Sequence, residues 1–161
     1  MGYIKGLRGD SSISQKEAIL ELFKNGKDSI PSLIDSIECN KKIMLMFTNP
    51  RLSFRRDDVM NGYAGIASAY VIEFILAKDR IDERAYWSGF FLLGSDIDNY
   101  IYSTGVIIKK NGDSIRSSDL SKIRLIYKIW WKKNRDKPIE VLREEWKQNN
   151  RPLTGSKYRW I

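Results

Sequence analysis

Residues 57–78 constrain the fold more than any other segment, because they combine helical spacing with many small side chains. Large apolar residues recur there at intervals of three and four, as on one side of a helix. The small residues between them are Gly62, Ala64, Gly65, Ala67, Ser68 and Ala69. Asp57 or Asp58 can cap the start of this helix. The segment therefore predicts a helix that packs closely against other helices, since small side chains allow close approach.

A helical hairpin is predicted over residues 14–38. The run that begins at Ser14 and ends at Glu17 is a capping box, in which both side chains satisfy free backbone N–H groups. Gly26 ends this first helix, because glycine adopts the left-handed C-cap conformation without steric cost. Ser29 or Asp28 then caps the second helix, and a proline follows in its first turn.

A second helical hairpin is predicted over residues 118–148. One of the two serines at its start caps the first helix, which ends near Asn134. Asp136 caps the following helix, with Pro138 in its first turn. The sequences of the two hairpins do not repeat each other, so no internal repeat is evident.

Between these hairpins, residues 106–116 predict a small β-hairpin. Asn111-Gly112 lies between two extended segments, and this dipeptide tolerates positive φ at both turn positions. The C-terminal residues 149–161 are rich in apolar side chains for a chain end. We expect them to fold back onto the helices, with Leu153, Tyr158 and Trp160 as anchors.

The composition excludes most catalytic chemistry. The chain has no histidine, and its one cysteine is Cys39. Ser-His-Asp and Cys-His catalysis are therefore ruled out, as are zinc, iron and iron–sulfur sites built from His or Cys. Two carboxylate candidates remain: Asp96 with Asp98, in a loop that lacks the glycine and glutamate of a calcium site, and Glu73 in the apolar helix. Neither supplies an acid–base pair, and we predict a non-enzymatic protein without metal or cofactor.

Positive charge is concentrated in the C-terminal third. The net charge is +8, and residues 109–161 hold 15 of the 28 Lys and Arg residues. Four cations of the helix after residue 117 follow an i, i+4, i+8, i+11 spacing, which places them along one face. These are Arg124, Lys128, Lys132 and Arg135. We call this set the basic stripe. It predicts docking on an acidic partner or on a phosphate backbone, and a merely solvated helix face is the alternative.

Four of the five tryptophans also lie in this third. Trp130 and Trp131 are adjacent, so on a helix they point about 100° apart. We expect one in the core and the other partly exposed or covered by the tail, and a buried indole N–H needs a partner. The predicted partner-binding residues are therefore the basic stripe together with four residues near it: Trp131, Arg151, Arg159 and Trp160.

The run Lys16–Ile34 contains a helix, a glycine turn and an Ile-Pro-x-Leu-Ile opening of a second helix, and it resembles a HEAT-type helical hairpin. The runs Asn61–Ile66 and Arg151–Tyr158 resemble those of small bacterial proteins, including the immunity proteins encoded beside secreted toxins. The resemblance implies a protein that binds and blocks a toxin and has no catalysis of its own.

These observations predict a mainly α fold: residues 1–161 form a single compact helical domain with HEAT-like helical hairpins and one small β-hairpin. The hydrophobic content of 42% and the aromatic content of 12% support a folded core. The predicted function is non-catalytic protein binding, with an immunity or inhibitor protein that occludes a toxin's active site as the most concrete form. The alternative is a nucleic-acid-binding protein that uses the basic helix face.

No apolar run reaches the ~20 residues of a membrane span, and the N-terminus lacks the apolar core of a signal peptide. A cytoplasmic location is therefore favoured over the periplasm, which would require that a signal peptide has already been removed. The partner is expected to be an acidic protein.

Overall fold

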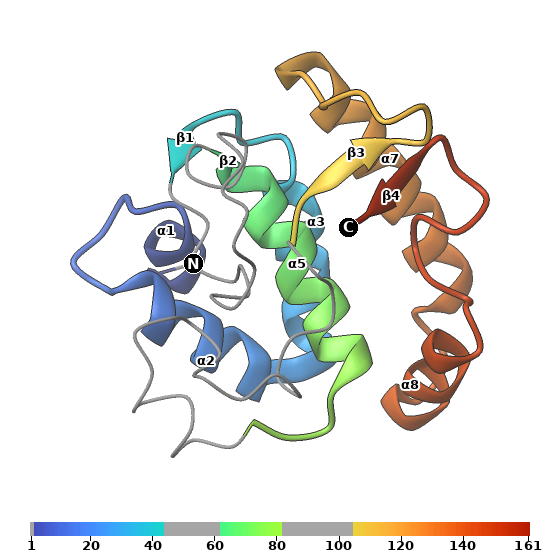
Figure 1. The fold of residues 1–161 in the computed structure, drawn as a ribbon. Coiled ribbons are helices and arrows are strands. Elements are labelled where there is room, and N and C mark those ends of the chain that lie inside the picture. The colour runs from blue at the N-terminus through green and yellow to red at the C-terminus, as the bar shows by residue number, and fades with distance from the viewer. Residues whose placement is uncertain (1, 44–61, 82–104) are drawn as a thin grey trace.

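The computed structural model describes residues 2–43, 62–81 and 105–161 (Figure 1). The described part is mainly helical, as predicted, with two small antiparallel strand pairs. Its elements are α1 (Gly2–Leu7), α2 (Gln15–Asn25), a 3₁₀ turn η1 (Gly26–Ser29), α3 (Ile30–Ser36), β1 (Lys42–Ile43), β2 (Gly62–Tyr63), α5 (Ala64–Ala77), β3 (Ile107–Lys109), α7 (Ser117–Asn134), α8 (Ile139–Lys147) and β4 (Tyr158–Trp160). The loop with the candidate carboxylates Asp96 and Asp98 lies outside the described residues.

Helix α5 is the centre of the fold. Every residue from Ala64 to Leu76 is buried, which is typical of a helix that is apolar all round. In Figure 1, α1 and α2 lie to the left of α5, α3 runs behind it, and α7, α8 and β4 lie to its right. One hydrophobic cluster joins side chains from all of these elements.

Close packing of the small-sided helix is confirmed at Gly65. A Cβ atom at this position would lie 1.9 Å from the carbonyl oxygen of Ile37, just after α3. The predicted extent of the helix is wrong at its start. Gly62 and Tyr63 pair with β1, so their backbone groups belong to a β-ladder and the helix begins at Ala64.

Helix α2 has the predicted ends. The Ser14 hydroxyl accepts a hydrogen bond from the Glu17 N–H at 3.1 Å, and Gly26 has a φ of 57°. The predicted side-chain cap of α3 is wrong. Ser29 already has helical φ and ψ, because the chain enters α3 directly from η1 and needs no side-chain cap.

Helix α1 was not predicted from the sequence. It buries Leu7 and packs against α2, whereas α3 packs mainly against α5. Helices α2 and α3 therefore do not pack chiefly on each other, as the two helices of an isolated hairpin would.

Helices α7 and α8 occupy nearly the predicted ranges, but their predicted caps are wrong. The first residues of α7 are stabilised by Asp119, whose carboxylate accepts from the Arg116 N–H at 2.9 Å. Asp136 is 94% exposed, and Pro138 with extended backbone precedes the first residue of α8. The i, i+3, i+7 spacing of Ile139, Leu142 and Trp146 predicts the buried stripe of α8; Leu142 and Trp146 are buried, and Ile139 is half-buried.

The predicted β-hairpin is wrong in its partner strand. The chain does turn at Asn111-Gly112, but of these two residues only Gly112 has positive φ. Strand β3 pairs with β4 from the C-terminal segment, and residues 113–116 contribute a single bridge at Ser114. The ladder groups of β3 are thus satisfied by a strand about fifty residues away, which a local turn signal cannot reveal.

The prediction that the C-terminal residues fold back onto the helices is confirmed. Leu153 and Tyr158 are buried, and Trp160 packs against the core. The C-terminal segment therefore forms part of the surface beside α7.

Candidate binding surface

Helix α7 is the longest helix of the positively charged C-terminal third, among the described residues. Its buried side carries Leu120, Ile123, Tyr127 and Trp130, which pack into the core. The opposite side faces solvent. We define the outer face of α7 by four exposed residues: Leu125, Lys128, Ile129 and Lys132.

The structure divides the basic stripe into members with and without ion pairs. Arg124 donates to Asp35 of α3 at 2.7 Å and to Glu38 at 3.2 Å. Arg135 lies 4.0 Å from its neighbour Asp136. Lys128 and Lys132 have no ion pair within the described ranges. Two glutamates of the neighbouring helix α8 pair with other lysines: Glu145 with Lys137 and Glu144 with Lys147.

Trp130 and Trp131 differ in burial as predicted, with one in the core and the other partly exposed. Trp130 is 8% exposed, and the ring of Trp131 is half-buried and stacked beside it at 6.5 Å. Lys27 covers Trp131 at 5.9 Å from its centroid, so the N-terminal half rather than the C-terminal segment shields it. The Trp130 N–H has no hydrogen-bond partner in the part of the chain that the structure describes, and nothing there explains this.

Trp160 has a structural contact network. Its N–H donates to the Tyr127 hydroxyl at 3.3 Å, and its ring packs edge-on against Tyr70 at 5.8 Å. The indole therefore fixes β4 against α7 and α5.

A large groove of about 850 Å³ runs between α7 and residues 148–156. Ile126, Ile129 and Lys133 of α7 line one wall. Lys137 also lines the groove and is paired with Glu145 at 2.7 Å, a hydrogen bond that lowers the pKa of the Glu145 carboxyl below its usual value. None of the described residues that line this groove is acidic.

A small hollow of about 250 Å³ lies on the other side of the same C-terminal segment. Three cations line it: Lys110, Arg151 and Arg159. Arg151 lines the large groove as well, so it stands between the two hollows. Again, no acidic side chain appears among the described residues around this hollow.

The predicted partner-binding residues thus fall on two sides of α7. Lys128 and Lys133 are five positions apart and point about 140° away from each other. Arg151, Arg159 and Trp160 line the hollows on the Lys133 side, and no member of the basic stripe lines either hollow. Ile129 belongs to both the outer face and the large groove, which makes the two regions adjacent.

A buried carboxyl group holds together the elements that form these walls. Glu73 of α5 is 0% exposed and accepts from Tyr127 of α7 and from Trp146 of α8, both at 2.6 Å. This arrangement differs from the catalytic role considered for Glu73. It positions α7 and α8 relative to the central helix.

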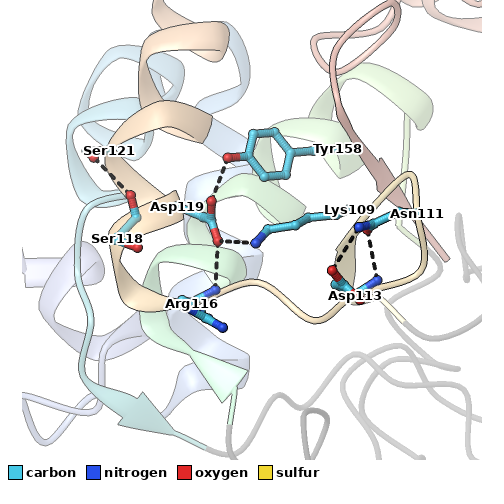
Figure 2. Close-up of polar contacts among 8 residues, drawn as sticks. All are labelled: Lys109, Asn111, Asp113, Arg116, Ser118, Asp119, Ser121 and Tyr158. Carbon is cyan, nitrogen blue, oxygen red and sulfur yellow. Dashed lines mark hydrogen bonds and ion pairs between the residues drawn. The ribbon is translucent and has the colours of Figure 1, made fainter.

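Asp119 makes a second buried network at the other end of α7 (Figure 2). It accepts from Tyr158 at 2.8 Å and from the Arg116 N–H at 2.9 Å, and Lys109 lies 3.4 Å away. Burial by itself would raise the pKa of Asp119, but these hydrogen bonds and the charge of Lys109 outweigh it and lower the pKa. Burial and the bond to Asp119 raise the pKa of Tyr158.

Sequence reasoning missed Ile126, Ile129 and Lys133 as wall residues. Their i, i+3, i+7 spacing was visible, but it becomes a groove wall only where residues 148–156 lie opposite. No local pattern gives the position of that segment.

Comparisons with protein-family models, curated proteins and solved structures find no match for this chain. Within residues 2–43, 62–81 and 105–161, no helix is both long and apolar enough to span a membrane. In the same ranges, the acidic and cysteine side chains form no group of three or more that could hold a metal ion.

Proposed function

We propose that this chain is a non-catalytic protein-binding domain that recognises an acidic protein partner through the outer face of α7. One observation carries the proposal. Leu125 and Ile129 are 56% and 49% exposed and alternate along the helix with Lys128 and Lys132, which lack ion pairs among the described residues. Apolar side chains that lose water on binding supply affinity, and unpaired cations speed association with an acidic surface.

The most concrete form of this function is an inhibitor or immunity protein that occludes the active cleft of a toxin. That proposal draws on the resemblance to HEAT-type hairpins, from which the chain departs: it has the order of helix, glycine turn and helix, but α2 and α3 do not pack chiefly on each other. A rigid helical platform suits steric occlusion, because the inhibitor loses little conformational freedom on binding.

A non-catalytic role agrees with the two buried carboxyl groups of the described chain. Glu73 and Asp119 are each held by donors from separate elements, and each connects helices or strands. They serve the packing of the fold, and they are too enclosed to meet a substrate.

The test is quantitative capture of a partner from an extract of the cells that make the protein, followed by binding kinetics with the purified partner. We expect the double variant Lys128→Glu and Lys132→Glu to lower the association rate about tenfold at low salt, with a smaller loss at high salt. Leu125→Ser with Ile129→Ser should raise the dissociation rate about tenfold, because it removes the apolar contact.

The matched control is Lys5→Glu with Lys24→Glu, which changes the net charge equally on α1 and α2. Both lysines are exposed, and the ion pair of Lys24 with Glu21 contributes little to stability. An equal loss of association in this control would show a general charge effect and contradict the proposal. Salt-sensitive binding of a mixed-sequence DNA duplex that depends on Lys128 and Lys132 would support the nucleic-acid alternative instead.

A further inference from the structure

We propose that the large groove and the small hollow form one continuous site for an extended acidic segment of the protein partner. This inference rests on the proposed function, because it specifies which part of the partner is recognised. The two hollows share the lining residues Asn149, Arg151, Thr154 and Gly155. A bound chain can therefore pass from one hollow to the other across this turn.

The charge of the site selects an acidic segment. Lys133 in the large groove, and Lys110 and Arg159 in the small hollow, have no ion pair with any described residue. Lys137 is already neutralised by Glu145. The side chains that line both hollows thus carry a net positive charge, which attracts an acidic segment more strongly than a neutral or basic one.

Arg151 is oriented to receive a carboxylate at the junction. Its guanidinium lies 3.9 Å from the ring centroid of Trp146, and its Nε donates to the Trp146 carbonyl at 3.1 Å. These two contacts fix the plane of the guanidinium. The remaining N–H groups have no partner among the described residues, so they can form a forked pair of hydrogen bonds with a carboxylate.

The turn that carries Arg151 is fixed before any ligand binds. The Thr154 hydroxyl donates to the Asn149 carbonyl at 2.8 Å and accepts from the Arg151 N–H at 3.3 Å. The Thr154 N–H donates to the Arg151 carbonyl at 3.0 Å. Pro152 and Leu153 are buried beneath the turn. A fixed turn reduces the entropy lost on binding.

The apolar wall favours a peptide over a nucleic acid. Single-stranded nucleic acids bind through bases stacked on accessible aromatic rings. Here the large groove presents Ile126 and Ile129, and the ring of Trp130 beside them is buried. The half-buried ring of Trp160 at the small hollow is packed edge-on against Tyr70. Aliphatic side chains suit an apolar amino-acid side chain between acidic ones.

The test uses a synthetic peptide, Glu-Asp-Leu-Glu-Asp-Leu-Glu-Asp, and a control peptide with Gln and Asn in place of Glu and Asp. Backbone amide shifts of the ¹⁵N-labelled full chain are followed during titration. We expect the acidic peptide to shift the amides of Lys110 and of residues 149–155 other than Pro152, and the amide peptide to bind at least about tenfold more weakly. The variant Lys110→Glu with Arg159→Glu should weaken binding about tenfold, and the matched variant Lys5→Glu with Lys24→Glu should leave it within about twofold.

Arg151→Gln gives an independent readout, because it removes the fork and its charge and leaves a shorter, uncharged polar side chain. It should weaken the acidic peptide and leave the circular dichroism spectrum unchanged. Three results would overturn the site: equal binding by both peptides, shifts confined to the outer face of α7, or tighter binding of a twelve-nucleotide DNA strand to the same residues. Capture of the natural partner that fails in Lys128→Glu with Lys132→Glu, yet survives Lys110→Glu with Arg159→Glu, would refute this inference and leave the proposed function standing.

Discussion

At the scale of single residues, Gly65 sets the distance between the N-terminal helices and the centre of the fold. The backbone of α5 lies so near the end of α3 that no side-chain atom fits between Gly65 and the Ile37 carbonyl. The carbonyl is part of the backbone and cannot move away as a flexible side chain would. Any larger residue must therefore push the two helices apart.

We predict that Gly65→Ala lowers the free energy of unfolding by about 2 kcal/mol or more, since overpacking at a backbone contact is strongly destabilising. Urea denaturation followed by circular dichroism measures this change. The control is Gly2→Ala, where the new Cβ meets the Ile13 side chain at an ordinary 3.6 Å. A loss at Gly65 no greater than that at Gly2 would contradict the argument.

At the scale of elements, Asp119 joins the start of α7 to both strands of the β3–β4 pair. The pKa of Asp119 is lowered in the folded chain, from an ordinary value of 3.8. The resulting stabilisation is complete at pH values above the ordinary pKa. It is lost as the pH falls through the lower pKa of the folded state.

We therefore predict that the wild-type chain loses stability below about pH 4 more steeply than the Asp119→Asn variant, because the variant has no carboxylate to protonate there. The measurement is a series of urea denaturation curves between about pH 2.5 and 6. Tyr158→Phe, which removes one donor to the same carboxylate, should show an intermediate slope. Parallel curves for all three proteins would exclude this role for Asp119.

Local sequence patterns predicted those helix ends and buried faces that depend on residues a few positions away. The Ser14 cap, the Gly26 end and the buried stripe of α8 depend on neighbours within a few positions. The partner of β3 and the start of α5 were predicted wrongly, because distant strands supply the backbone hydrogen bonds there. The predicted serine cap of α7 failed because Arg116 is the N-cap residue, and Asp119, three positions further along, accepts from the Arg116 N–H.

The sequence predicts that the candidate binding surface is positively charged, but it does not predict the two hollows in that surface. The sequence places the cations in the C-terminal third, and spacing puts four of them on one face. It gives no sign that Asp35 and Glu38 neutralise Arg124, because these acids lie more than eighty positions away. The hollows depend on where residues 148–156 pack, which tertiary contacts decide.

At the scale of the whole molecule, the contacts of Glu73 connect α5 to the two helices on its C-terminal side. We predict that Glu73→Ala lowers the free energy of unfolding by about 3 kcal/mol or more, because it leaves two buried donors without this acceptor and opens a cavity. Equilibrium denaturation followed by tryptophan fluorescence measures the loss.

Tyr127→Phe is the control for this prediction. It removes one donor to Glu73 and also the acceptor of the Trp160 N–H, while it keeps the ring, so the expected loss is about 2 kcal/mol. Glu73→Gln retains one acceptor oxygen and should fall between these two variants. If Glu73→Ala is as stable as the wild type, Glu73 does not hold the helices together.

The contacts of Glu73 also bear on how the chain finds its native state. The two donors lie 54 and 73 positions further along the sequence, so the network forms only after long loops have closed. Closing such loops costs entropy before the contacts can compensate for it. A chain whose central contacts are so distant in sequence should refold more slowly than a bundle built from local helical hairpins, although its individual helices form fast.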